Sequence, residues 1–387
     1  MKKILRHLSF VGIVFLFASC ENKNATLSEG ILRYKVGEST LNLDDSTAID
    51  FMRISYAEEE GNEYLLHQNE FKKSIQVFDL ESGLVAHEIL YPFEQPLGIK
   101  VVQGITAISL DSIFIFMPLS IRGSILINRK GEILNRYMPT KEEDLEKSLI
   151  NHVSFGAMPT LFDGQNLRFI QLPTFEVSNP SNINDTYKFE MLYNLESNEI
   201  EEAEESGFPE FYQNKIWPSQ DISVSRIMDL QGRIVYSWRF LDSLIVVENG
   251  IVEKMLAKSN FKKQDMSPFQ LMPNKVQDME KLIQFTKYYG IYYDEYRDLF
   301  YRTVQHPGVF DGDAIPKEMD ASRKFSVLIL DHQFNKLNEI VFPGGIYNIY
   351  RAFVGKRGFY LPKNNVMNPE LVEDTLSIDI FDFTAHD

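Results

Sequence analysis

The chain has 387 residues, of which 44% are hydrophobic and 13% aromatic, and its formal net charge at pH 7 is -16. This length and apolar content allow a large buried core, whereas the acidic balance excludes nucleic acid as a partner, because phosphates need clustered Lys and Arg. The single cysteine excludes an intrachain disulfide and a cysteine-based metal site.

The first twenty residues have the pattern of an export signal. Three basic residues precede an apolar run from Leu8 to Ala18, and Ser19 then leads directly to Cys20. The run is shorter than the about 20 residues that a transmembrane helix needs, and small residues stand before the cleavage point. We therefore predict a signal peptide over residues 1–19, lipid attachment at Cys20, and a lipidated tether over residues 20–29.

From residue 30 onward, a pattern of strand-like runs separated by turns recurs six times. The runs are rich in Val, Ile, Phe and Tyr, and they end at Gly, Asn or Asp, as hairpin turns require. Several runs are apolar on both faces, which is typical of strands packed between neighbouring sheets. Corresponding positions in the six units are Asp79, Asn128, Asn194, Glu248, Asp331 and Phe381.

The spacing of these units predicts an all-β fold, a six-bladed β-propeller that occupies residues 30–387 as a single domain. The shortest steps are about 50 residues, which suits one four-stranded blade, and the longer steps contain insertions. The last unit lacks its final strand, and the first strand-like segment, Gly30–Val36, has no unit of its own. We expect these ends to pair, because ring closure removes free sheet edges. A two-sheet sandwich or an irregular pair of all-β domains is the alternative.

Two stretches depart from the β pattern. Thr140 and Glu143 form a capping-box pattern ahead of apolar residues at helical spacing. The stretch Asn274–Lys287 follows Pro273 and carries one apolar stripe. We predict short helices here, within insertions between blades and packed on one propeller face. A helix that binds a partner is the alternative.

Catalytic and metal-binding patterns are weak. The chain contains no G-x-S-x-G, H-E-x-x-H, P-loop or G-x-G-x-x-G pattern, and its histidines are scattered without ligand spacing. Asp311-Gly312-Asp313 resembles the start of a calcium loop, but Pro316 and the early Glu318 break the twelve-residue pattern. We predict an exposed turn at this position.

Two aromatic clusters are the candidate ligand contacts. Five tyrosines occur within residues 288–296. Strand alternation would place Tyr289, Ile291 and Tyr293 on one face, and mostly Tyr288, Tyr292 and Tyr296 on the other. Such a cluster is compatible with packing between blades or with an aromatic platform for a sugar ring or peptide. The candidate ligand-binding residues are Trp217, Tyr288, Tyr292, Tyr293, Arg302 and His306.

The role of each candidate follows from its chemistry. Arg302 and His306 would supply polar contacts beside the tyrosine platform. Trp217 lies in the Pro-bracketed, aromatic-rich segment Phe208–Pro218, and an exposed Trp there would indicate a binding surface.

The basic start, the Ala-Ser-Cys ending of the signal, the acidic Tyr-, Phe- and Asn-rich body and the loose repeat together resemble lipoproteins of the Bacteroidota. Leu16–Cys20 resembles a lipobox, with Phe17 where the family pattern has Leu. More narrowly, the chain resembles one of their families known only as a domain of unknown function. More broadly, it resembles six-bladed propellers of the TolB-like kind. The resemblance implies lipid anchoring in the cell envelope, at the outer membrane. In such lipoproteins an acid-rich stretch after the lipidated cysteine favours the cell surface. Only Glu21 is acidic among the residues just after Cys20, so the resemblance does not choose between the periplasmic and the surface leaflet.

Two functions from different classes are compatible with these features. The first is a membrane-anchored binding protein, without cofactor or catalysis, that holds a glycan, a peptide or an envelope protein. The alternative comes from resemblance to six-bladed calcium-dependent lactonases. It is a hydrolase with a divalent cation in the central channel, held by Glu, Asn and Asp side chains.

Overall fold

A computed structural model of the chain describes residues 29–94, 98–138, 150–218 and 223–384. The predicted signal peptide, Cys20, nearly all of the predicted tether and the predicted helix that starts at Thr140 lie outside the described residues.

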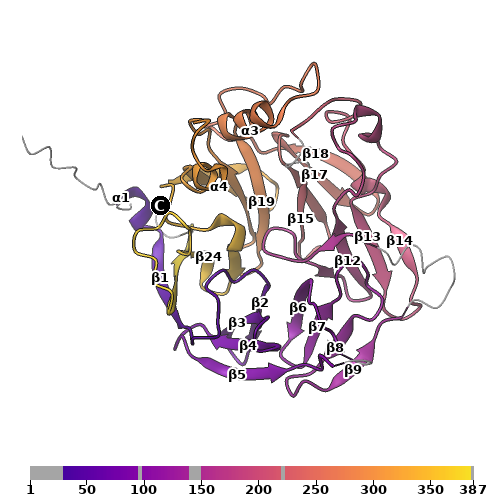
Figure 1. The fold of residues 1–387 in the computed structure, drawn as a ribbon, viewed down its shortest axis with the longest axis vertical. Helices are drawn as coiled ribbons and strands as arrows, with labels where there is room; N and C mark the ends of the chain where they lie inside the picture. The colour runs from indigo at the N-terminus through magenta and orange to yellow at the C-terminus, as the bar shows by residue number, and fades with distance from the viewer. Residues whose placement is uncertain (1–28, 95–97, 139–149, 219–222, 385–387) are drawn as a thin grey trace, which may run out of the picture.

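Six antiparallel sheets surround a central axis and form a six-bladed β-propeller, as predicted (Figure 1). Five sheets have four strands, and the sheet of blade 3 has five because its innermost strand is split in two. Blade 1 consists, from the centre outward, of β2 (Ile54–Glu59), β3 (Asn62–Asn69), β4 (Ser74–Asp79) and β5 (Val85–Leu90). Blade 2 consists of β6 (Gly104–Ser109), β7 (Ser112–Phe116), β8 (Ile125–Ile127) and β9 (Ile133–Arg136). Blade 3 consists of β10 (His152–Val153) with β11 (Leu161–Phe162), then β12 (Asn166–Gln171), β13 (Glu190–Asn194) and β14 (Ile200–Glu202). Blade 4 consists, in the same order, of β15 (Val224–Met228), β16 (Ile234–Trp238), β17 (Ser243–Glu248) and β18 (Ile251–Leu256). Blade 5 consists of β19 (Lys287–Asp294), β20 (Leu299–Gln305), β21 (Phe325–Leu330) and β22 (Lys336–Phe342). Blade 6 consists of β23 (Phe353–Gly355), β24 (Gly358–Pro362), β25 (Thr375–Phe381) and β1 (Lys35–Asn42).

The two ends of the chain close the ring, as predicted, because β1 pairs antiparallel with β25 as the outermost strand of blade 6. In Figure 1 the indigo β1 lies beside the yellow final blade. The predicted boundaries of the closing strand, Gly30–Val36, are wrong. Residues Glu29–Leu32 form the short helix α1, and the strand starts only at Lys35. The apolar character of this segment has another cause, since Ile31 and Tyr34 are buried in the core between blades 5 and 6.

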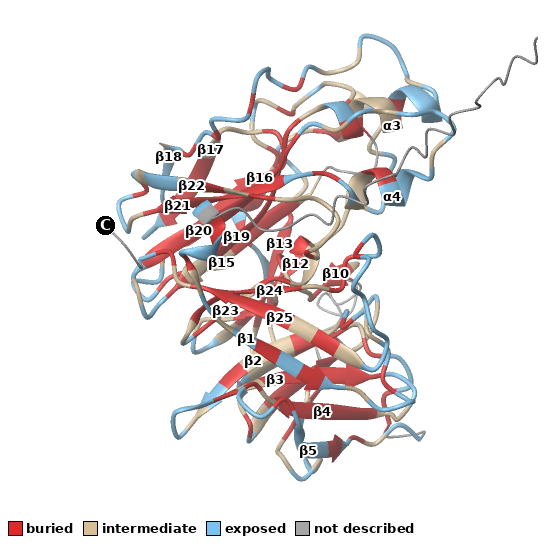
Figure 2. Cartoon of the chain, turned by 90° about the vertical axis from the view of Figure 1, so that its left-hand side faces the viewer, coloured by how far each residue is buried: buried red, intermediate tan, exposed pale blue. Residues whose placement is uncertain are grey.

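The core consists of six hydrophobic clusters, one between each pair of neighbouring blades. Strand alternation divides the apolar residues of a blade between its two interfaces. In β3, for example, Leu65 packs toward blade 6 and the adjacent Leu66 packs toward blade 2. Figure 2 shows the resulting buried strands throughout the stack. Burial on both faces, which the sequence predicted, is therefore confirmed.

The tyrosine-rich strand β19 differs from its prediction. Tyr288 faces Val304 and Ile291 faces Arg302, so that Tyr289 and Gly290 together oppose a single residue of β20. This bulge interrupts the alternation. Tyr288 and Ile291 consequently pack toward blade 4, whereas Tyr289 packs toward blade 6. The prediction that Tyr289 and Ile291 share a face is wrong for this reason.

Two further helices lie on one face of the propeller, at the right-hand side of Figure 2. The predicted helix after Pro273 is confirmed as α3 (Lys275–Gln284), and Asn274 caps it in a capping box with Gln277. Helix α4 (Pro316–Ala321) lies between β20 and β21 and was not predicted. Short 3-10 helices occupy Pro180–Asn182 (η1), Glu204–Ser206 (η2) and Ile349–Arg351 (η3). Within the described part of the chain, no helix is both long and apolar enough to cross a membrane.

Ring closure by β1 can be tested with Leu41→Ala. Leu41 is fully buried between blades 6 and 1, and we expect its truncation to lower the free energy of unfolding by about 2–5 kcal/mol. The control is Thr40→Ala, because Thr40 is the adjacent, exposed residue of β1, and its change should be about 0.5 kcal/mol or less. Urea unfolding followed by tryptophan fluorescence measures both. Equal effects of the two variants would show that β1 adds little to closure.

Candidate functional site

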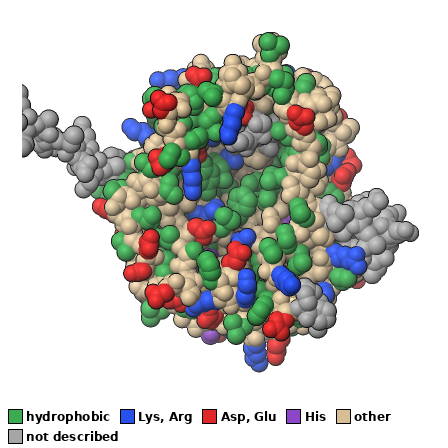
Figure 3. Space-filling model, viewed as in Figure 1, with side chains coloured by type: hydrophobic (Ala, Val, Ile, Leu, Met, Phe, Trp, Pro, Cys, Tyr) green, Lys and Arg blue, Asp and Glu red, His purple; other side chains and the backbone are tan. Residues whose placement is uncertain are grey.

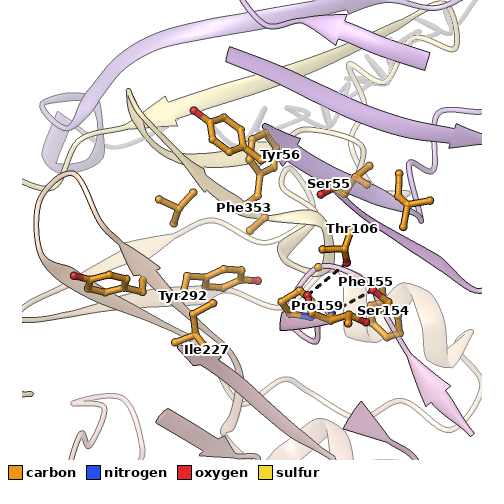
Figure 4. Close-up of a pocket in the computed structure, with 16 residues that line it drawn as sticks. Ser55, Tyr56, Thr106, Ser154, Phe155, Pro159, Ile227, Tyr292 and Phe353 are labelled. Carbon is orange, nitrogen blue, oxygen red and sulfur yellow. Dashed lines mark hydrogen bonds between the residues drawn. The ribbon is translucent and has the colours of Figure 1, made fainter. Parts of the chain in front are cut away.

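The innermost strands of all six blades meet around a central channel that contains a cavity of about 200 Å³ (Figure 4). Each blade contributes to its wall. The labelled residues are Ser55 and Tyr56 from β2, Thr106 from β6, Ser154, Phe155 and Pro159 from blade 3, Ile227 from β15, Tyr292 from β19 and Phe353 from β23.

Blade 3 fills part of the channel because its inner strand leaves the sheet. Val153 pairs with Ile170 and Leu161 pairs with Arg168. Residues 154–160 therefore stand opposite a single position of β12 and form a loop, which we name the channel turn. Five of its residues line the cavity: Ser154, Phe155, Gly156, Pro159 and Thr160.

Tight backbone contacts hold the channel turn. Met158 donates its amide to the carbonyl oxygen of Phe155 at 2.7 Å, which closes the tip of the turn. Gly156 has a φ of +38°, and a Cβ there would lie 2.3 Å from the carbonyl oxygen of Tyr350 in blade 6. A Cβ on Gly104 of β6 would lie 2.5 Å from the side chain of Ser154. Glycine at these two positions lets the turn approach Tyr350 on the segment before β23 and the inner strand β6.

Side chains of blade 4 anchor the same turn. The Ser225 hydroxyl donates to the carbonyl oxygen of Ala157, and the Arg226 guanidinium donates to that of Pro159. Arg226 is fully buried and also donates to the carboxylate of Glu190 at 2.7 Å. The turn is therefore connected to a charged group inside the protein.

Glu190 is the centre of this buried network. Its carboxylate accepts hydrogen bonds from Arg226, from Arg168 at 2.9 Å and from the Tyr236 hydroxyl. Burial by itself would raise the pKa of Glu190, but the two guanidinium groups outweigh burial and hold the pKa below its ordinary value. Glu190 is therefore a charged carboxylate that fixes Arg226, and through it the channel turn.

The cavity wall is uncharged at neutral pH. It is built from aliphatic and aromatic side chains together with Ser, Thr and Tyr hydroxyls, and it includes no Asp, Glu, His, Cys, Lys or Arg. Burial raises the pKa of Tyr292 well above its ordinary value, so its hydroxyl stays a phenol. That hydroxyl donates to the carbonyl oxygen of Ile349 at 3.4 Å. The arrangement can bind an uncharged ligand and offers no acid or base that titrates near neutral pH.

A divalent cation does not fit this wall. Calcium in proteins takes six to eight oxygen ligands and relies on carboxylates, which the cavity wall lacks. Over the described ranges of the chain, no three His, Cys, Asp or Glu side chains group in a way that could hold a metal ion. Asp311-Gly312-Asp313 forms an exposed turn, as predicted.

Two of the six predicted ligand contacts, Tyr292 and Tyr293, line the cavity. Tyr288 and Arg302 are instead fully buried between blades 4 and 5. The Arg302 guanidinium stacks 3.5 Å from the centre of the Tyr288 ring and donates to the carbonyl oxygen of Ala257 at 2.9 Å. Their position supports packing between blades, the structural alternative, and not a ligand platform.

His306 and Trp217 also lie away from the cavity. His306 is buried, stacks on Phe261, and has its Nε2 3.0 Å from the Ser326 hydroxyl. Burial lowers the pKa of His306 to about 4, so it is neutral at pH 7. Trp217 is 1% exposed and donates to the carbonyl oxygen of Tyr212 at 2.8 Å. The exposed tryptophan that would indicate a binding surface is therefore absent at this position.

Sequence reasoning missed most of the cavity wall. Ser55, Tyr56 and Thr106 lie on short inner strands that precede the repeated runs. Their one sequence signal is a short alternating run directly before each unit, such as Gly104–Ser109.

The anchoring role of Glu190 predicts a large effect of Glu190→Gln. The substitution leaves the buried Arg226 without its charge partner, so we expect the free energy of unfolding to fall by about 3–5 kcal/mol. Hydrogen exchange of residues 154–160 should also become faster. The control is Glu253→Gln on β18, where the side chain is exposed. Urea unfolding and hydrogen exchange measure the two effects, and unchanged exchange in the channel turn would contradict the anchoring.

Comparison with known proteins identifies a family. The model of the family described as "Domain of unknown function (DUF4221)" matches residues 28–341. A search of the curated proteins found no match.

Several solved structures are similar to this chain. A member of the DUF4221 family from Bacteroides vulgatus has 23% sequence identity and a TM-score of 0.77, with coverage of 90% of this chain and 97% of that chain. A candidate exported protein from Bacteroides fragilis has 13% identity and a TM-score of 0.50, with coverage of 89% and 95%. Regucalcin, a calcium-binding protein from Agrobacterium tumefaciens, has 10% identity and a TM-score of 0.42, with coverage of 88% and 92%. At these identities the two Bacteroides structures show a shared fold alone, whereas the family match spans most of the sequence. The chain therefore belongs to the DUF4221 family, a family of domains of unknown function.

Proposed function

We propose that this protein is an exported lipoprotein whose propeller binds an uncharged ligand and catalyses no reaction. The observation that carries the proposal is the central cavity, to which all six blades contribute aromatic and hydroxyl-bearing side chains. General acid–base catalysis needs groups whose pKa lies near the working pH. The polar side chains of the cavity wall are hydroxyl groups, which do not titrate near neutral pH. Binding without a cofactor is therefore the function that the chemistry of the cavity supports best.

The size and chemistry of the cavity indicate the ligand class. Its volume of about 200 Å³ is below the about 300–1,000 Å³ of pockets that enclose drug-sized ligands. One sugar residue or one peptide side chain is of suitable size. Aromatic rings such as Tyr56 and Phe353 can cover the apolar face of a sugar, and the hydroxyls of Ser55 and Thr106 lie in the same wall. We infer a glycan terminus or a segment of an envelope protein as the ligand.

Anchoring through Cys20 would place this binding site at a membrane. The signal pattern and the lipobox resemblance support export and lipidation. The acidic net charge of -16 disfavours adsorption to anionic headgroups, so the lipid would be the means of attachment. The similar fold of a candidate exported protein from Bacteroides fragilis agrees with this location. We propose the outer membrane, in its periplasmic or its surface leaflet.

Lipidation can be tested with a thiol reagent, because Cys20 is the only cysteine. A mature lipoprotein carries its lipid on that sulfur, so we expect the protein purified from membranes to resist maleimide even after unfolding. A Lys254→Cys variant supplies an exposed thiol and is the positive control for labelling. Cys20→Ser should move the protein from the membrane to the soluble fraction. Complete labelling of the membrane-derived protein would contradict lipidation.

Ligand binding in the cavity can be tested with glycan and peptide arrays followed by Thr106→Phe. The larger ring should fill the cavity, so we expect the affinity for any retained ligand to fall at least about tenfold, which corresponds to about 1.4 kcal/mol. The matched control is Ile108→Phe on the same strand, where the side chain is exposed and outside the cavity wall. Titration calorimetry measures both variants. A ligand that binds the Thr106→Phe variant with unchanged affinity would show that the ligand does not bind in the central cavity.

A further inference from the structure

The outermost strand of each blade has no neighbouring strand on its outward edge in the described structure. A free edge can pair with a strand of another protein, and short strands, bulges and charged side chains are the usual protection. Four outer strands, β1, β5, β9 and β22, have a register shift against their inner neighbour, and β14 has only three residues. Figure 3 shows charged side chains of both signs along the rim of one face. The edge of blade 4 differs, because β18 pairs with β17 over six residues without a shift.

The outer strand β18 is also rich in exposed apolar side chains. Ile251, Val252 and Leu256 are 64%, 53% and 70% exposed. Glu253 and Lys254 lie between them and are exposed as well. Covering this apolar surface with a partner strand is favourable, because it removes the side chains from water. A long, regular and apolar edge is therefore a candidate surface for pairing with another chain.

The backbone of β18 offers hydrogen bonds to such a strand at every second residue. Ala257, which directly follows β18, donates its amide to the carbonyl oxygen of Asp242 at 2.9 Å. The residues of an antiparallel strand alternate between bonding their neighbour and pointing away from it. The pairing continues from Ala257 along all of β18 without a shift. The amide and carbonyl groups of Val252, Lys254 and Leu256 therefore point outward, toward the open edge.

The charges of β18 argue against a second copy of this chain as the partner. Two-fold antiparallel pairing sets one residue opposite its own counterpart. The two registers with the longest overlap are centred on Glu253 and on Lys254, so each brings two like charges together. Like charges directly opposite each other destabilise a sheet. The partner that matches this edge has an acidic residue opposite Lys254, a basic residue opposite Glu253, and apolar residues on both sides.

We propose that the outer edge of β18 binds an extended segment of another protein, which pairs with it as an antiparallel fifth strand of blade 4. From its N-terminus, the segment has two apolar residues, an acidic residue, a basic residue and two apolar residues. In such strand addition, main-chain hydrogen bonds supply affinity and side chains supply specificity. This surface goes beyond the proposed function, because β18 lies at the outside of its blade and contributes nothing to the wall of the central cavity.

Fluorescence anisotropy of the full-length protein with two labelled peptides tests the proposal. The matched peptide is Ser-Val-Ile-Glu-Lys-Val-Ile-Ser. The control peptide, Ser-Val-Ile-Lys-Glu-Val-Ile-Ser, has the same composition with the two charges exchanged. We expect the matched peptide to bind at least about fivefold more tightly, because the control sets like charges opposite Glu253 and Lys254. Equal affinities, tighter binding of the control, or no binding of either peptide would overturn the proposal.

Exchanging the charges in the protein locates the binding. The double variant Glu253→Lys with Lys254→Glu keeps the net charge and should prefer the control peptide by a similar factor. An unchanged preference would show that the peptides bind elsewhere and would contradict the proposal. The Thr106→Phe variant should bind the matched peptide normally, so failure of this edge is distinguishable from failure of the central cavity.

A proline substitution tests the hydrogen-bond ladder. Lys254→Pro removes an outward amide and leaves the bonds to β17 in place, so we expect the affinity for the matched peptide to fall at least about tenfold. Lys254→Ala keeps the amide and loses one exposed charge pair, so its affinity should fall by about threefold or less. Thermal unfolding checks that both variants are folded, and equal affinities of the two would contradict strand addition.

Sedimentation of the protein without peptide tests the choice of partner. We expect the same mass for the wild-type chain and for Lys254→Pro. A wild-type dimer that this variant dissociates would show that a second copy of the chain pairs with β18, and it would overturn the proposal.

Discussion

Closure of the ring is the constraint on which the rest of this structure depends. Each blade is a twisted sheet that is apolar on both faces, so it is stable only between two neighbours. The six hydrophobic clusters supply these contacts, and the pairing of β1 with β25 completes the sixth blade. Because closure brings six inner strands together, it also creates the central channel and the cavity within it. The proposed binding site is thus a consequence of the way in which the two ends of the chain meet.

Within the closed ring, a buried charge holds the channel turn in place. Glu190 holds Arg226, and Arg226 holds the channel turn at Pro159. A buried ion pair adds little net stability compared with apolar packing, but losing one partner is costly. We interpret this network as the device that keeps residues 154–160 away from their own sheet. Regular strand pairing is lost at residues 154–160 of blade 3, and this turn instead forms part of the uncharged cavity wall.

The sequence by itself determined the number of blades, the meeting of the two ends and helix α3. These features depend on local alternation, turn residues such as Asn249-Gly250, and the cap at Asn274, all of which act over a few residues. Only the tertiary structure decided which side chains reach a cavity. Tyr288 and Tyr292 look equivalent in the sequence, but a bulge at Tyr289 and Gly290 turns Tyr288 toward blade 4 and Tyr292 toward blade 6, where Tyr292 also lines the cavity. Thr106 and the channel turn form one wall of the candidate site only because strands distant in sequence meet after closure.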